Sequence, residues 1–162
     1  MHDLGELILE GVANSLEAGA SFVSIKLEKK GESFEVDIQD NGILLEGKDF
    51  FSSGFSTKGE NRGKGLSLIR LADNKARLYR EDGYTILSFK TKDDGSLDAL
   101  EDVLFPIFQF DIAILFSYIV EGKELLRLSK ERGEELSKVG EIVDFKHLIK
   151  SKIRSVQCQN SH

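Results

Sequence analysis

The chain has 162 residues, of which 31% are charged and 40% are hydrophobic, a balance typical of a soluble globular protein rather than a disordered one. Its net charge of −6 argues against broad nucleic-acid binding, because the phosphate backbone would be repelled from most of the surface. The single cysteine excludes an intramolecular disulfide framework and the usual cysteine-based zinc sites, and it fits a reducing, cytoplasmic location. We therefore expect one folded domain, or one domain with an appendage, and no signal peptide.

Hydrophobic spacing predicts a helix first, because apolar residues recur at every fourth position from Leu4 to Ala20 and Gly19 is placed to end the helix. Alternating patterns and turn residues then predict further elements. These are strands at 22–28 and 33–39, a long loop at 43–63 with one helical turn near 48–51, a helix at 66–72, and hairpin strands at 76–80 and 84–90. This order predicts an α/β two-layer sandwich with a mostly antiparallel sheet and helices on one face.

Residues 92–96 form the predicted boundary between a domain at 1–95 and a mainly helical C-terminal region at 96–154, followed by a frayed tail at 155–162. Within that region, residues 103–120 are almost wholly apolar and approach the length of a membrane span. Pro106, Gln109 and Asp111 interrupt the run, so we interpret it as a buried core segment or as an interface, including that of a homodimer.

Glu10 and Asn14 form the first cluster of residues that suggests chemistry. At positions i and i+4 of the predicted helix, they project from the same face, one turn apart. The amide oxygen of an asparagine can bind Mg²⁺, and a carboxylate beside it can orient or deprotonate a water molecule. The alternative is two solvated polar residues on a helix surface.

The second cluster is the tripeptide at residues 40–42, at the end of a predicted strand. The carboxylate of Asp40 could accept a hydrogen bond from an exocyclic amine, and Gly42 would let a flat ring approach the backbone. The alternative is an ordinary Asp-Asn-Gly turn.

The third cluster is the segment at 54–66, which is rich in glycine, hydroxyl and basic residues and precedes a predicted helix. Free backbone N–H groups, the positive end of a helix and basic side chains together can bind an anion. The spacing matches neither a Walker A loop nor a dinucleotide-binding fingerprint, and a flexible polar loop is the alternative.

Together, in this order and spacing, the three clusters resemble the Bergerat-fold ATP-binding superfamily of gyrase, Hsp90, sensor histidine kinases and the MutL mismatch-repair proteins. Residues 10–20 look like the N box, closest to its MutL form, and residues 40–42 look like the start of the G1 box. Residues 55–59 and 62–66 look like the lid and G2 box of sensor kinases. The resemblance covers about residues 3–92.

The resemblance implies ATP and Mg²⁺ as ligands, with Asn14 holding the metal and Glu10 acting as general base. It implies that Asp40 bonds the adenine amino group and that Gly42 lines the ring. The residues it places around the phosphates are Ser56, Thr57, Lys58, Gly59, Arg62, Gly63, Lys64, Gly65 and Leu66. Two departures from the pattern are Leu44, where the G1 box usually has a second glycine, and Ser67, where the G2 box usually has a last one.

The leading functional hypothesis is an ATP-binding protein with a histidine-kinase-like domain that hydrolyses ATP or phosphorylates a separate protein partner in regulation. A sensor kinase needs an upstream helix with a phosphoacceptor histidine, which we do not expect here, so the small stand-alone kinases of the superfamily are the nearest analogy. The alternative is a nucleotide-sensing interaction module with little or no turnover. Glu10 favours the enzyme, because binding alone does not need a base.

Overall fold

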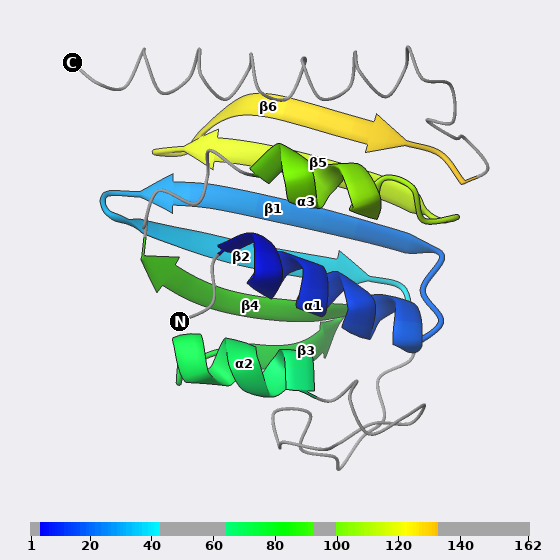
Figure 1. Ribbon diagram of the computed structural model, residues 1–162, viewed down its shortest axis with the longest axis horizontal. Helices are drawn as coiled ribbons and strands as arrows, with labels where there is room; N and C mark the ends of the chain where they lie inside the picture. Colours follow the sequence, from blue (N-terminus) through cyan, green and yellow to red (C-terminus); the bar gives the residue numbers. More distant parts are fainter. Residues whose placement is uncertain (1–3, 43–63, 93–99, 133–162) are drawn as a thin grey trace.

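The computed structural model describes residues 4–42, 64–92 and 100–132 (Figure 1). Its elements, in chain order, are α1 (Leu4–Glu17), β1 (Phe22–Lys30), β2 (Ser33–Asp40), α2 (Lys64–Ala72), β3 (Arg77–Glu81), β4 (Tyr84–Lys92), α3 (Leu100–Ile107), β5 (Ala113–Val120) and β6 (Lys123–Lys130). Up to β4, the predicted helices at 4–20 and 66–72 and the four predicted strands are present within a few residues of their expected bounds. The predicted loop at 43–63, with its helical turn near 48–51, lies outside the described residues.

The described strands form one six-stranded sheet in the order β3-β4-β2-β1-β5-β6. All neighbours pair antiparallel except β1 and β5, which are parallel. The three helices lie on one face of this sheet, with α1 and α2 side by side and α3 nearer β5 (Figure 1). The predicted two-layer α/β sandwich with a mostly antiparallel sheet is therefore confirmed.

Helix α1 packs closely on the sheet because its buried face includes a glycine. A Cβ added at Gly11 would lie 2.5 Å from Cδ1 of Ile38, so a side chain there would force Ile38 to move within the core. The helix ends in a Schellman motif, in which Gly19 has a φ of +82° and Ala20 N donates to Ser15 O at 3.1 Å. This motif fixes the direction in which the chain turns into β1.

The prediction of a mainly helical region at 96–154 is wrong for residues 113–130, which form β5 and β6 of the same sheet. The apolar run in β5 has no clear period, and a short continuous apolar run cannot be told from a buried helix segment by periodicity. Its β-branched and aromatic residues favour a strand. A turn with positive φ at Glu121 and Gly122 then joins β5 to β6.

The apolar segment at 103–120 supplies much of the hydrophobic core, as its interpretation as a buried core segment predicted. Its buried hydrophobic side chains are Leu104, Ile107, Phe108, Ile112, Ile114, Phe116 and Tyr118. The apolar character of the segment is thus accounted for by contacts inside the chain. Among the helices of the described ranges, none is both long and apolar enough to cross a membrane.

Candidate functional site

Glu10 and Asn14 lie one turn apart on α1, and both side chains are partly exposed. Their neighbours Gly11 and Ser15 belong to the buried face, so the pair borders the packed side of the helix. Within the described ranges, neither side chain makes a hydrogen bond or an ion pair with another residue. The amide and carboxylate oxygens are therefore placed on one flank of α1, as their spacing predicted.

The carboxylate of Asp40, the last residue of β2, is buried, with 2% of the residue exposed. The alternation of β2 puts it on the helix-facing side of the sheet with Phe34, Val36 and Ile38. Its Oδ2 accepts a hydrogen bond from Ser15 Oγ at 2.6 Å, and its Oδ1 accepts one from Gly42 N at 2.7 Å. These two donors use about half of the four lone-pair positions of a carboxylate, so Asp40 can accept further hydrogen bonds.

Burial raises the pKa of Asp40 above its ordinary value, because the charged form is poorly solvated there. The hydrogen bonds from Ser15 and Gly42 and the positive charge of Arg80 act in the opposite direction on this pKa. A buried carboxylate that keeps unused acceptor capacity is unusual, since buried charges are normally fully paired. It is a candidate binding group on that physical ground.

Gly42 lies against the last turn of α1. A Cβ at this position would be 2.9 Å from both Cβ and the carbonyl oxygen of Ala18, and 3.0 Å from Oδ1 of Asp40. Contacts with Ala18 and with the Asp40 carboxylate therefore already require a residue without a side chain at position 42. From the sequence alone, the role expected of this glycine is only to let a flat ring approach the backbone. Next to it, Asn41 Oδ1 accepts hydrogen bonds from Ser21 N at 2.9 Å and Phe22 N at 3.1 Å, which ties the end of β2 to the start of β1.

Three residues near Asp40 were not singled out from the sequence. Ser15 follows Asn14 directly, so its contact with Asp40 joins the helix of the first cluster to the strand end of the second. Thr85 of β4 is buried and is the register partner of Asp40, and Arg80 of β3 donates to Thr85 Oγ1 at 3.2 Å. From the sequence, the one signal for these residues was the position of the Ser15 hydroxyl directly after Asn14, the predicted metal ligand. Thr85 and Arg80 become neighbours of Asp40 only through the strand register.

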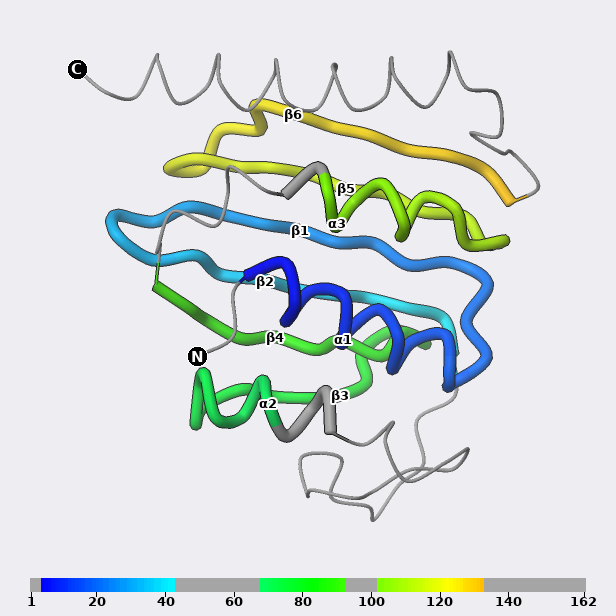
Figure 2. Tube along the Cα trace, viewed as in Figure 1, coloured from blue at the N-terminus to red at the C-terminus, as the bar shows by residue number. Residues whose placement is uncertain are grey.

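The structure describes only part of the third cluster. The backbone of Lys64, Gly65 and Leu66 forms the first turn of α2, which runs in the opposite direction to α1 (Figure 2). That first turn is therefore at the end nearer the last turns of α1. The other predicted phosphate-contacting residues lie outside the described residues, as does Leu44; they are Ser56, Thr57, Lys58, Gly59, Arg62 and Gly63.

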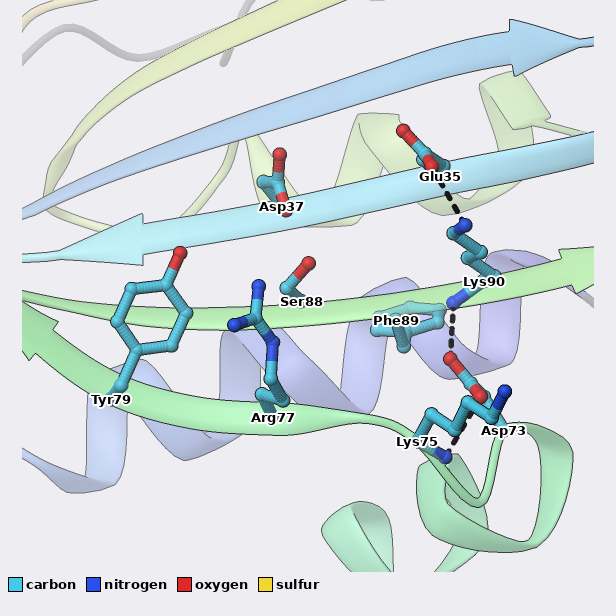
Figure 3. A pocket seen from close by; sticks show the side chains of 9 residues that line it. All are labelled: Glu35, Asp37, Asp73, Lys75, Arg77, Tyr79, Ser88, Phe89 and Lys90. Carbon is cyan, nitrogen blue, oxygen red and sulfur yellow. Dashed lines mark hydrogen bonds and ion pairs between the residues drawn. The ribbon is translucent and has the colours of Figure 1, made fainter.

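A separate groove of about 480 Å³ lies on the opposite face of the sheet, away from Asp40 (Figure 3). It is lined by side chains of both charges, among them Asp37, Arg77 and Lys90. Arg77 is positioned over the ring of Tyr79, 5.0 Å from its centroid, and Lys90 forms an ion pair with Glu35 at 3.1 Å. None of the residues predicted to act in catalysis or nucleotide binding lines this groove.

No protein-family model and no curated protein matches the chain. Among solved structures, it is similar to the N-terminal domain of a DNA repair protein, with a TM-score of 0.58 and 16% identity over 94% of this chain and 59% of that chain. It is also similar to the Aquifex aeolicus MutL ATPase domain complexed with ADP, with a TM-score of 0.51 and 16% identity over 89% of this chain and 70% of that chain. This chain thus spans 59% of the length of the first structure.

At 16% identity these similarities show the fold, which is that of the MutL ATPase domain. The fold that the predicted resemblance implied is therefore confirmed. The closer likeness of residues 55–66 to sensor kinases stays a prediction.

Proposed function

We propose that this chain binds ATP through Asp40 and hydrolyses it with Glu10 as the general base. The observation that carries the proposal is the buried Asp40 carboxylate, which retains acceptor capacity at the end of β2 in a chain with the fold of the MutL ATPase domain. The similar MutL ATPase domain is complexed with ADP, which supports an adenine nucleotide as the ligand.

In this proposal, the free lone pairs of Asp40 accept a hydrogen bond from the adenine amino group. Ser15 and Gly42 hold the carboxylate in a fixed orientation, because each donates to a different oxygen. Such a charge-assisted hydrogen bond contributes about 1.5–3 kcal/mol when solvent is excluded. A guanine base presents a carbonyl at the same position and would be repelled.

Asn14 would hold Mg²⁺ through its amide oxygen, which suits the preference of this ion for oxygen ligands. The ion, when bound, would offset negative charge on the phosphates. Glu10 lies one turn away on the same flank of α1, where its carboxylate could orient a water molecule and take its proton. Lys64, Gly65 and Leu66 open α2, whose first N–H groups would face the phosphates.

We favour hydrolysis over phosphotransfer, because hydrolysis needs only water and a base, whereas transfer needs an acceptor that the chain does not identify. Phosphorylation of a separate protein partner remains the alternative activity. If the pure protein binds nucleotide without hydrolysing it, the nucleotide-sensor hypothesis is favoured instead.

Incubation with γ-labelled ATP and Mg²⁺, with and without host lysate, separates these activities. We expect free labelled phosphate from the pure protein, and its loss in Glu10→Ala but not in Glu28→Ala, a control carboxylate on β1. Labelled protein that appears only with lysate would favour the kinase. Neither product, in a chain that still binds ATP, would contradict the enzyme proposal.

A further inference from the structure

Arg80 makes three hydrogen bonds that connect separate parts of the chain around Asp40. Its Nη1 donates to the carbonyl oxygen of Gly42 at 2.9 Å and to Thr85 Oγ1 at 3.2 Å. Its Nη2 donates to the carbonyl oxygen of Gly83 at 3.0 Å. One side chain of β3 thus joins the end of β2, the start of β4 and the turn between β3 and β4.

The strand register explains why Arg80 reaches this position. Arg80 is the partner of Thr85, and Thr85 is the partner of Asp40, so the three residues form one row across β3, β4 and β2. Thr85 and Asp40 are buried, whereas Arg80 is exposed at the rim of the sheet with Nη1 turned inward. The row thus extends from the solvent-exposed Arg80 to the buried carboxylate of Asp40, which we propose binds the adenine base.

We propose that Arg80 is a positioning residue for base recognition, which holds the Asp40–Gly42 backbone in place and supplies a positive charge that acts on the Asp40 carboxylate. This inference rests on the proposed function, because it assigns Arg80 a role in nucleotide binding. It adds a residue from β3 that none of the three sequence clusters contains.

The backbone of Gly42 is held on both sides. Its N–H is donated to Asp40 Oδ1 at 2.7 Å, and its carbonyl oxygen accepts from Arg80. Without a side chain, Gly42 has wide conformational freedom, so these two bonds are what fix its orientation. Loss of the arginine bond would free one side and loosen the donor that orients the carboxylate.

The charge of Arg80 also affects the protonation of Asp40. Burial raises the pKa of Asp40, and Arg80 is the charged group of the described chain that lowers it. The other groups that contact this carboxylate, Ser15 from α1 and the Gly42 N–H, are neutral, as is Thr85 in its row. Removal of the arginine charge should therefore raise this pKa further, and a protonated Asp40 loses acceptor capacity for an amine.

The test is a calorimetric titration of the full chain with ADP and Mg²⁺ from about pH 5 to about pH 8, for the wild type and three variants. Arg80→Gln removes the charge, and Arg80→Lys keeps the charge but loses the planar, two-pronged geometry. Arg77→Gln is the matched control, because Arg77 lies on the same strand but on the opposite face, over Tyr79. Thermal unfolding of each variant checks that it is folded.

We expect Arg80→Gln to bind ADP about tenfold more weakly at neutral pH, with the loss of binding on acidification moved to higher pH. Arg80→Lys should bind about threefold more weakly while its acid limb stays where the wild type has it. Arg77→Gln should match the wild type in both respects.

A folded Arg80→Gln with wild-type affinity, or with weakened binding but an unmoved acid limb, would overturn the inference. If Arg80→Gln does not fold, wild-type affinity in Arg80→Lys would overturn it as well. A wild-type chain that binds no ADP would overturn the proposed function and this inference together. Binding that is lost in Asp40→Asn yet unchanged in Arg80→Gln would overturn the inference alone.

Discussion

Asp40→Asn should weaken nucleotide binding while it leaves the fold intact. The Gly42 N–H can only donate, whereas the Ser15 hydroxyl can rotate to accept, so the new amide should turn its oxygen to Gly42 and its NH₂ to Ser15. Ser15 can still donate to the carbonyl oxygen of Gly11, which lies 3.4 Å from its Oγ. Every buried polar group at the site therefore keeps a partner in the variant.

The cost to binding follows from what the variant can no longer offer the ligand. Its NH₂ group now stands where Oδ2 was, and the adenine amine loses a charged acceptor. The loss should be about 1.5–3 kcal/mol, which corresponds to one to two decades in the dissociation constant. The stability of the free protein should not fall, because asparagine is neutral. The variant therefore no longer buries a carboxyl group whose pKa is raised by burial.

Calorimetric titration with ADP and Mg²⁺, together with thermal unfolding of the free protein, measures both quantities. Asp37→Asn is the matched control, since Asp37 lies on the same strand but on the opposite face. Unchanged ADP affinity in Asp40→Asn would refute the assignment of the base-binding group. A weakened affinity with a collapsed melting transition would show that the substitution acts through the fold, contrary to this reasoning.

Three further predictions concern the neighbouring residues. Glu10→Ala should lower turnover by about 10²–10⁴-fold with less than about a tenfold change in ATP affinity, whereas Asn14→Ala should weaken both, as steady-state kinetics and titration would show. Gly42→Ala should destabilise the free protein by about 1–3 kcal/mol in denaturant unfolding, because its Cβ would lie 2.9 Å from the carbonyl oxygen of Ala18; wild-type stability would contradict this packing. ADP affinity should fall as the pH drops through the raised pKa of Asp40. The stability that protonation of Asp40 contributes to the free protein should be present at low pH and lost as the pH rises through that same pKa.

The sequence predicted the first two-thirds of the fold because local patterns there are strong. Strand β2 alternates cleanly, α1 repeats its apolar residues every four positions, and Gly19 ends that helix as expected. The pattern failed at β5, where apolar residues stand at successive positions and the alternation expected of a strand is lost. Its place beside β1, in parallel, depends on contacts between distant segments that no local window contains.

The candidate site was predictable to a similar extent. Glu10 and Asn14 are one helical turn apart by spacing alone, and Asp40 ends a strand whose alternation buries it. The partners of Asp40 were not predictable in this way, since Ser15 meets it across the helix–sheet interface and Arg80 through the register of two strand pairs. Contacts of this kind arise only when the sheet is assembled.

The most direct test of the central claim is a crystal structure of the chain with ADP and Mg²⁺. The proposed function predicts the adenine amino nitrogen within about 2.7–3.2 Å of the Asp40 carboxylate, with the metal ion bound to Asn14 Oδ1. Adenine bound away from Asp40, for example in the groove beside Arg77 on the opposite face, would contradict it.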